Sequence, residues 1–387
     1  MQIFEVGESK RLVRDFIELP IRLYKNYPNW IRPLDADIEE VFDPKRNKFF
    51  RNGECTRWVL KDNHGLTIGR VAAFVNNKTA KSNNQPTGGF GFFECINNQD
   101  AAFLLFDTCK IWLKERDMEA MDGPINFGER DKWWGLLLEG DFEPNYCMPY
   151  NPPFYRDFFE AYGFQVYFYQ YTYFRPVDGE LSPKIYEKYE RLIKDPGFRF
   201  EHMKLSQIEK YTNDFRTIYN KAWSKHTGVA AMPEAQAKAL MKKLKPVIDE
   251  KIFWYGYYNN EPIAFFIILP ELNQIFKHVN GKMDWLGKLK FVWHRYVQGI
   301  HKMFGVAFGV VPEFQGRGVE GAIVIASAQL IQKKLKYKEF EMNWIGDFNP
   351  KMMHVAESVG GKIRKTHATY RKLFDETKPF ERCPIIE

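Results

Sequence analysis

A glycine-rich turn between an apolar strand and a helix is the part of the sequence best suited to bind a ligand. It lies in the segment Phe308 to Ala322, which reads FGVVPEFQGRGVEGA. The start of a helix offers unpaired backbone N–H groups and partial positive charge. Gly316 and Gly318 let the chain approach a ligand closely, and Arg317 adds a full positive charge. We expect a pyrophosphate site, although an ordinary strand-to-helix turn would also use glycines.

The elements around this turn recur in the chain, which indicates two copies of one folding unit. Asn151 is followed twelve residues later by Gly163, and Asn349 is followed eleven residues later by Gly360. A helix-length stretch separates each pair, and an aromatic strand follows each glycine. Asn-Pro and Gly are common at turns, so chance is the alternative. Several matching offsets in one order favour a duplication.

Each copy predicts the same order of elements. A strand and helices are followed by a hairpin, a third strand, a helix, a short strand, the Asn-Pro helix and a last strand. We therefore expect an α/β (α+β) fold, in which each copy has a mixed, mostly antiparallel twisted sheet flanked by helices. The predicted boundaries are 1–176 for the first copy, 177–197 for a linker with a helix, and 198–387 for the second copy.

The composition is that of a globular protein without a membrane span. Of the 387 residues, 45% are apolar and 27% are charged, which excludes a disordered chain. The longest apolar run, Ile263 to Leu269, is far shorter than the ~20 residues of a membrane-spanning helix. The first residues lack the layout of a secretory signal. We therefore expect a cytoplasmic protein.

Cysteine spacing and net charge restrict the kinds of metal, cofactor and partner that the sequence indicates. Five cysteines are scattered without a CxxC pair, which argues against a disulfide framework and a structural zinc site. The net charge of +7 suits an anionic partner, such as a phosphorylated cofactor or a lipid headgroup. No dense block of Lys and Arg occurs, so a nucleic acid partner is not indicated.

The glycine turn resembles the acyl-CoA loop of the GNAT N-acetyltransferase superfamily. The matching string VPEFQGRG runs from Val311 to Gly318, and Asn349, a helix and Gly360 follow where the family has its asparagine and helix. The resemblance covers most of residues 198–375. It implies a tandem GNAT fold, acyl-CoA as donor substrate and no metal. The cofactor-binding residues that it implies are Val310, Val311, Gln315, Gly316, Arg317, Gly318, Val319, Glu320, Gly321 and Asn349.

Two positions depart from the family pattern. Glu320 stands where the loop usually has its last Gly or Ala, which leaves the loop geometry open. Ala356 stands where many members have a tyrosine that protonates the leaving thiolate. The usual general acid is therefore not implied for this chain.

Four residues are candidates for the proton transfers that such a reaction needs. Glu339, Glu341 and Asn343 share one face of a predicted strand, so Glu341 is a candidate base if that face meets the cleft. Asp347, just before Asn349, is another. Tyr370 and His226 are weaker candidates for protonating the thiolate. The alternative for each of the four is an ordinary structural role at a strand edge, at a helix end or in the core.

The first copy resembles the superfamily only in outline. Its third strand is followed by Asn97 to Asp100 without a glycine loop, and Asp100 would repel a phosphate. We expect a degenerate unit that does not bind CoA. The polar and aromatic segment Gly123 to Gly135 is expected either to border the acceptor pocket or to be a packed surface loop.

The whole chain resembles a narrower group, the tandem-GNAT bacterial ceramide-synthase-like proteins. The resemblance rests on Gly123-Pro-Ile-Asn, Tyr150-Asn-Pro-Pro, Leu269-Pro-Glu-Leu-Asn273 and the Glu320 variant of the loop. It implies an N-acyltransferase that uses a fatty acyl-CoA. The implied acceptor is a long-chain, sphingoid-type amino alcohol or its keto form, as in bacterial ceramide synthesis.

An insertion at 281–302 fits a lipid substrate or a peripheral contact at the inner membrane face. It mixes large apolar and aromatic side chains with five basic residues, and Asp284 is its only acid. Aromatic and basic residues together are typical of helices that lie in a membrane interface. The alternative is a helix packed in the core.

Two other function classes stay open beside the acyltransferase. The missing tyrosine allows a non-catalytic protein that binds acyl-CoA or associates with a membrane. Tandem GNAT copies also occur in aminoacyl-transfer enzymes of cell-wall peptide synthesis. The pyrophosphate loop disfavours that class, because a donor carried by tRNA would not need it.

Overall fold

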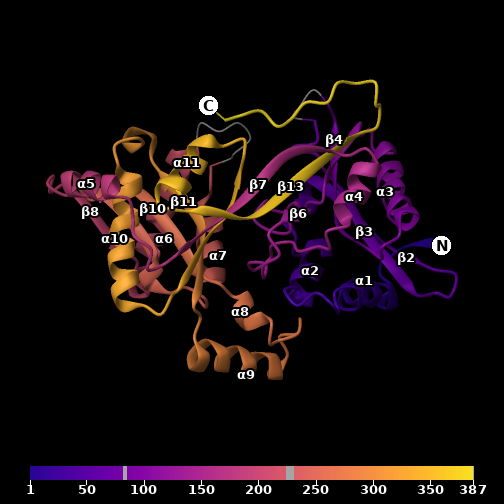
Figure 1. Cartoon of the computed structure of the whole chain (residues 1–387), viewed down its shortest axis with the longest axis horizontal. Helices are drawn as coiled ribbons and strands as arrows, with labels where there is room; N and C mark the ends of the chain where they lie inside the picture. Colours follow the sequence, from indigo (N-terminus) through magenta and orange to yellow (C-terminus); the bar gives the residue numbers. More distant parts are fainter. Residues whose placement is uncertain (82–84, 224–230, 387) are drawn as a thin grey trace.

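The computed structural model describes residues 1–81, 85–223 and 231–386, and shows two α/β halves (Figure 1). The first half comprises β1 (Gln2–Glu5), α1 (Lys10–Leu23), α2 (Asp35–Phe42), β2 (Gly53–Lys61), β3 (Thr67–Asn76), β4 (Thr87–Cys95), α3 (Gln99–Lys114), β5 (Ala120–Gly123), β6 (Leu136–Glu139), α4 (Tyr155–Ala161) and β7 (Gln165–Pro176). No helix among the described residues is long and apolar enough to cross a membrane.

After the linker helix α5 (Pro183–Leu192), the second half follows the same order apart from the added helices α8 and α9 and the strand β6 of the first half. It comprises β8 (Phe198–His202), α6 (Ile208–Trp223), α7 (Glu234–Leu244), β9 (Phe253–Tyr258), β10 (Glu261–Pro270), α8 (Asn273–Phe276), α9 (Trp285–Trp293), β11 (Lys302–Val310), α10 (Val319–Lys334), β12 (Glu339–Gly346), α11 (Pro350–Ser358) and β13 (Lys362–Leu373). The mixed α/β architecture predicted from the sequence is confirmed.

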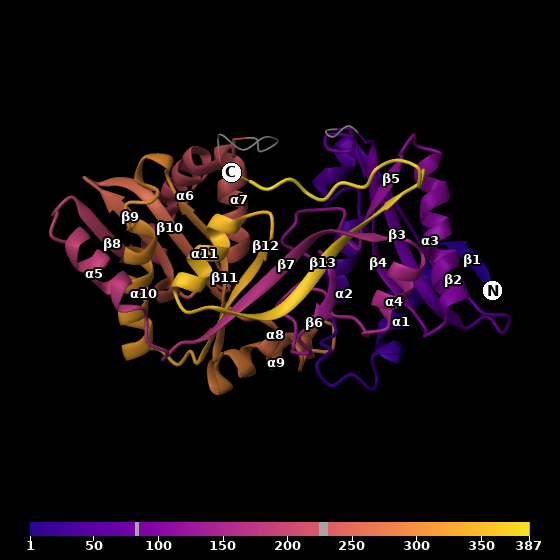
Figure 2. The ribbon, with the colours of Figure 1, turned by 45° about the horizontal axis from the view of Figure 1, so that its top comes forward.

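The two halves share one sheet because they exchange their last strands. The strand order is β1-β2-β3-β4-β5-β13-β7-β12-β11-β10-β9-β8, with β6 also paired to β13. Thus β13 completes the sheet of the first half beside β5, and β7 completes that of the second half beside β12. Both strands cross the centre of the molecule side by side (Figures 1 and 2). The sequence predicted a sheet in each copy, and the exchange joins the two into one.

Two antiparallel hairpins appear where the sequence predicts them. β2 and β3 are joined through Asp62, whose carboxylate accepts the backbone N–H groups of His64 and Leu66. β9 and β10 are joined through Asn259 and Asn260, which have φ values of 48° and 67°. Asparagine tolerates this left-handed conformation better than most residues, so it is well suited to such a turn.

Among the described strands, only β4–β5 and β11–β12 are parallel pairs, and each pair is short. β11 and β12 stay in register from Lys302 opposite Glu339 to Gly305 opposite Met342. At that point the register of β11 on β10 shifts, and Val306 is the extra residue. A bulge bends its strand and increases its twist. β11 therefore parts from β12 beyond Val306, and the two strands open like a wedge.

Candidate active site

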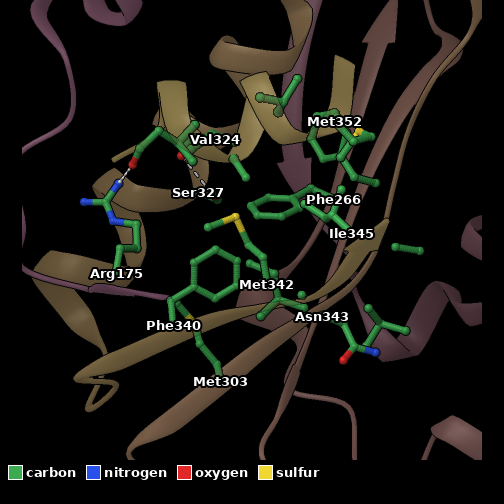
Figure 3. Close-up of a pocket in the computed structure, with 18 of the residues that line it drawn as sticks. Arg175, Phe266, Met303, Val324, Ser327, Phe340, Met342, Asn343, Ile345 and Met352 are labelled. Atoms are coloured by element: carbon green, nitrogen blue, oxygen red, sulfur yellow. Dashed lines mark hydrogen bonds between the residues drawn. The ribbon is translucent and has the colours of Figure 1, made fainter. Parts of the chain in front are cut away.

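The wedge between β11 and β12 opens into an apolar cavity of about 370 Å³. Its floor is formed by β10, β11 and β12, and its walls by α10, α11 and the end of β7. Figure 3 shows Phe266, Met303, Phe340 and Met342 gathered around it, whereas Asn343 lies apart from them. Along α10 the cavity reaches from Val324 to Gln332, which is about 12 Å at 1.5 Å per residue.

Several of the residues that line the cavity are small. They include Ser327 and Ala328 on α10, Ala356 on α11, and Gly305 and Ala307 on β11. One charged group reaches the wall, the guanidinium of Arg175. It donates to three backbone oxygens, those of Pro176, Val359 and Gly179. The interior is therefore suited to an alkyl chain rather than to a polar ligand.

The glycine turn has the geometry of an anion site at the start of α10. Gly316 and Gly318 have φ values of 71° and 93°, which L-residues with side chains rarely adopt. Gly318 is the N-cap and has no side chain to cap the helix. The first helical bond runs from Ala322 N–H to Gly318 O at 3.0 Å. The N–H groups of Val319 to Gly321 therefore lack acceptors within the helix.

Glu320 and Gly321 have contacts that the sequence did not predict. The Glu320 carboxylate accepts the N–H of Gly316 at 3.1 Å, so a negative charge already sits on the turn. Gly321 lies against α5, where an added Cβ would be 2.8 Å from Ile185 Cγ2. Gly321 therefore permits close packing of two helices, whereas Glu320 competes with any phosphate for one loop donor.

The end of β11 directs backbone groups into the wedge. Val311 N–H donates to Ile263 O at 2.9 Å, on the β10 side. Because alternate residues of a strand point their N–H groups to opposite sides, the N–H of Val310 faces away from β10. The Val310 carbonyl, on that same side, accepts the Gln315 side chain at 2.9 Å. Asn349, also at the cavity, caps α11 by accepting Met352 N–H at 3.2 Å.

The other face of β12 carries buried charges. The Glu341 carboxylate is fully buried and lies 2.9 Å from Lys302 Nζ, 2.8 Å from Lys365 Nζ and 3.1 Å from Arg364 Nη1. Burial alone would raise its pKa, but Lys365 and Lys302 outweigh burial and hold the pKa below its ordinary value. A carboxylate that is held ionised by three cations is unsuited to accept a proton, so the geometry does not favour Glu341 as the base.

Beside Glu341, a row of polar side chains crosses β12, β7 and β13. Thr172 lies opposite Lys365, and Gln170 lies opposite His367. Asn343 Oδ1, Thr172 Oγ1 and His367 Nδ1 are buried and have no hydrogen-bond partner. Buried polar atoms are seldom left unpaired. These three atoms are therefore free to bind a ligand or water. The row was not predicted from the sequence, although the alternation in YQYTY and KTHAT indicates it.

His367 is held in one orientation by the first half. Its Nε2 lies 3.3 Å from the carbonyl oxygen of Pro149. A carbonyl can only accept, so the proton is on Nε2 and the lone pair is on Nδ1. Burial lowers the pKa of His367 to about 4. The ring is therefore neutral near pH 7 and presents an unused acceptor.

Glu271 is a second buried group that the sequence analysis did not single out for chemistry. Its Oε1 accepts the N–H groups of Tyr146 and Asn273 at 2.9 and 2.8 Å, and its Oε2 has no partner. Burial raises the pKa of Glu271 to about 7, although Lys302 and both N–H groups act against the shift. Tyr146 belongs to the first half, so Glu271 lies where the halves meet.

Three further residues were predicted to take part in proton transfer: Asp347, Tyr370 and His226. Asp347 forms an ion pair of 2.5 Å with Arg382 near the C-terminus. Tyr370 packs against Phe159 of the first half, and its hydroxyl donates to Glu160 at 3.3 Å. Neither is among the described residues that line the cavity. His226 lies outside the described residues.

Segment 123–135 of the first half contacts strands of the second half. Trp344 Nε1 donates to Arg130 O at 3.0 Å, and Gln170 Nε2 donates to Trp134 O at 3.1 Å. The first half thus covers the face of the sheet that carries the polar row. In the described part of the chain no cluster of three or more His, Cys, Asp or Glu side chains could hold a metal ion.

Two curated relatives match almost the full length of the chain. A bacterial ceramide synthase from Caulobacter vibrioides (strain NA1000 / CB15N) is 28% identical over 370 residues, which cover 93% of this chain and 94% of the relative. Protein YghO from Escherichia coli (strain K12) is 25% identical over 374 residues, which cover 94% and 93%. No protein-family model matches the chain.

Solved structures agree on the fold. A tandem GNAT protein from the clavulanic acid biosynthesis pathway has a TM-score of 0.55 at 8% identity, covering 98% of this chain and 99% of that one. The GCN5-related glucosamine N-acetyltransferase region of a fungal multi-domain enzyme has a TM-score of 0.56 at 13% identity, covering 96% of this chain but 38% of that chain. The solved structures show that the chain has a tandem GNAT fold, and its sequence is similar over nearly all of its length to a bacterial ceramide synthase.

Proposed function

We propose that the protein is an N-acyltransferase that moves a long acyl group from CoA to an amine. The observation that carries the proposal is the apolar cavity along α10, the helix that begins at the glycine turn. The turn offers N–H groups to phosphates, and the cavity offers an apolar surface to an alkyl chain. In this proposal residues 198–387 bind the donor, and residues 1–176 cover the acceptor.

The donor is laid along α10. Its pyrophosphate lies at Gly316 to Gly321 with Arg317 beside it, and its thioester lies where β11 leaves β12. The acyl chain continues into the cavity towards Gln332. Each methylene that leaves water there contributes about 0.8 kcal/mol, so binding favours long chains over an acetyl group.

The acceptor amine is held on the opposite face of the wedge. Asn343 and Thr172 bind its polar end, and the lone pair on His367 Nδ1 accepts an N–H of the neutral amine. The amine lone pair then points towards the thioester carbon. These roles rest on the three unpaired buried atoms of the polar row and on the fixed tautomer of His367. We therefore assign the positioning of the amine to His367 rather than to Glu341.

The reaction forms one bond and breaks one. The amine nitrogen attacks the thioester carbon, and the backbone N–H near Val310 stabilises the oxyanion that forms. The C–S bond then breaks, CoA leaves, and the proton of the amine is the proton that CoA thiol gains overall. No metal takes part in this scheme. Holding both reactants in place supplies much of the rate enhancement.

The acceptor is a long-chain, sphingoid-type amine, and the reaction belongs to bacterial ceramide synthesis. The support is the similarity to a relative that bears the name bacterial ceramide synthase. Such an amine carries an alkyl chain and collects at membranes, so the enzyme works at the inner membrane face of the cytoplasm. The segment 281–302 makes the peripheral contact there.

A coupled assay tests the proposal. Purified protein is mixed with hexadecanoyl-CoA, with or without a long-chain 2-amino alcohol, and free CoA thiol and the amide product are both measured. We expect thiol release that depends on the amine, with one amide formed per thiol. The variant His367→Gln should lower kcat by about 100-fold or more, which is the scale of a lost general acid–base contribution. The affinity for hexadecanoyl-CoA should stay unchanged. Release of thiol without amide would contradict the proposal.

Two observations favour a second candidate, a protein that binds acyl-CoA without transfer. Glu320 occupies a loop donor, and Ala356 stands where many GNAT proteins have their acid. Tight binding of hexadecanoyl-CoA without turnover on a panel of amines would support it. An aminoacyl-transfer enzyme gains no support, because its donor would not use the glycine turn.

A further inference from the structure

Helix α9 and the turn after it expose an unusual number of large apolar side chains. Trp285 is 69% exposed and Tyr296 is 73% exposed. The others that are half exposed or more include Leu286, Leu289, Val292 and Trp293. They follow one another within a single segment that lies at the edge of the molecule (Figures 1 and 2). No described part of the chain covers them.

The apolar side of α9 faces solvent, which is the reverse of the usual orientation of an amphipathic helix. Its inward face is defined by Gly287, which is buried, and by Phe291, whose ring lies 5.9 Å from that of Phe276. At 3.6 residues per turn, Trp285 and Leu289 lie on the opposite side. A helix of a globular protein normally turns its apolar stripe towards the core. Here the apolar stripe faces solvent, which excludes the core-packed alternative.

Basic side chains flank the exposed stripe. Lys288 and Lys290 precede and follow Leu289, so they lie on either side of the outward face, and both are exposed. The only acid of the insertion, Asp284, is engaged as the N-cap of α9 through Gly287 N–H at 2.8 Å. Lys302, which the sequence analysis counted with the insertion, is instead buried against Glu341. The charge that remains at the surface is still positive.

We propose that α9 docks the protein on an anionic lipid bilayer, with the stripe around Trp285 and Leu289 at the boundary between headgroups and acyl chains. Trp and Tyr prefer that boundary, and flanking lysines reach the anionic headgroups. The core of a protein–protein interface is depleted of charged residues, so a lysine-flanked stripe suits lipid better than a second copy. The proposal does not depend on the catalytic activity.

Flotation with lipid vesicles tests the proposal on the full chain. Phosphatidylcholine vesicles with phosphatidylglycerol should carry the protein, and pure phosphatidylcholine vesicles should carry much less. The double variant Lys288→Glu, Lys290→Glu should reduce partitioning at least about 25-fold, because each lysine near an anionic surface contributes roughly a factor of five. The double variant Trp285→Ser, Leu289→Ser should also abolish flotation.

Matched controls separate docking from a damaged fold. Ile111→Ser removes an exposed apolar side chain on α3, and Lys184→Glu with Lys194→Glu reverses two charges at the linker helix. Both should float like the wild type, and circular dichroism should show that every variant is folded. Equal flotation of all variants, or none by the wild type, would overturn the proposal. So would a dimer in light scattering that the Trp285 variant dissociates, because a second copy would then cover the stripe.

Discussion

The wedge of the first half and the wedge of the second half begin alike and end differently. Both open beyond a short parallel pair, β4–β5 or β11–β12. In the first half Ile125 N–H donates to Phe90 O at 2.7 Å and joins the chain after β5 to β4. Rings of Phe90, Phe106, Phe159 and Phe164 pack at centroid distances of 5.0 to 5.9 Å. In the second half the corresponding space is a cavity.

One pair of positions explains much of this difference. Phe159 precedes Gly163 by four residues, and Ala356 precedes Gly360 by four. The two side chains therefore occupy equivalent places on α4 and α11. A phenylalanine fills the space above the sheet, whereas an alanine leaves it open. A duplicated fold can thus keep its scaffold while one copy becomes a core and the other a binding site.

The largest effect is expected from opening the closed wedge. Phe159 is fully buried among aromatic rings, so Phe159→Ala should lower the free energy of unfolding by ~3–5 kcal/mol, as is typical of a large-to-small core change. Urea denaturation measures it. The KM for acyl-CoA should stay the same. A stable variant with a raised KM would contradict the division of roles between the halves.

Glu271, where the two halves meet, should make the free energy of unfolding depend on pH. Its pKa of about 7 in the folded protein lies above the ordinary value. Folding is therefore stabilised by its protonation below about pH 4.5, and that contribution is lost as the pH rises through 7. The loss amounts to at most ~3 kcal/mol. In Glu271→Gln the difference in unfolding free energy between pH 5 and pH 8 should shrink by that amount. An unchanged pH profile would show that Glu271 titrates normally.

Closing the open wedge should have the next largest effect. Ala356→Phe places in the cavity the ring that Phe159 provides in the first half. We expect kcat/KM with hexadecanoyl-CoA to fall about 100-fold, because about 2.7 kcal/mol of apolar contact is lost, equal to three or four methylenes. Activity with a short acyl-CoA should fall much less. Equal losses with both donors would instead indicate misfolding, which thermal denaturation would detect.

The affinity of the glycine turn for CoA should depend more on the backbone conformation of the turn than on its charge. Gly318→Val introduces a branched side chain at a φ of 93°, so we expect it to abolish CoA binding in calorimetry. Arg317→Ala should weaken binding by only ~1–2 kcal/mol, the scale of a charge-assisted hydrogen bond. The turn Asn97 to Asp100 of the first half offers a control, because Asp100→Ala should leave CoA affinity unchanged.

The smallest effect is expected at Glu320. Glu320→Gln keeps an acceptor for Gly316 N–H but removes the negative charge from the turn. CoA should then bind about 5-fold more tightly, which corresponds to ~1 kcal/mol of relieved repulsion. Weaker binding in this variant would show that the carboxylate organises the turn rather than competing with phosphate.

Local patterns predicted the repeat, the hairpins and the glycine turn, because each depends on residues close in sequence. The exchange of β7 and β13 was not predicted. Both strands carry the same aromatic alternation, so nothing local tells which half each strand joins. The row of Thr172, Asn343 and His367 was missed for the same reason, since the strands β7, β12 and β13 that carry these residues become neighbours only through the exchange. Likewise, the local pattern around Glu341 does not reveal its ion partners, because Lys302, Arg364 and Lys365 come from other strands.

Titration of the full chain with hexadecanoyl-CoA tests most directly the claim that one wedge binds and the other is closed. The account predicts one site per chain. It also predicts much weaker binding of acetyl-CoA, and loss of the long-chain preference in Ala356→Phe with no change in Phe159→Ala. Two sites per chain would contradict the account. So would one site whose affinity for hexadecanoyl-CoA changes in Phe159→Ala but not in Ala356→Phe.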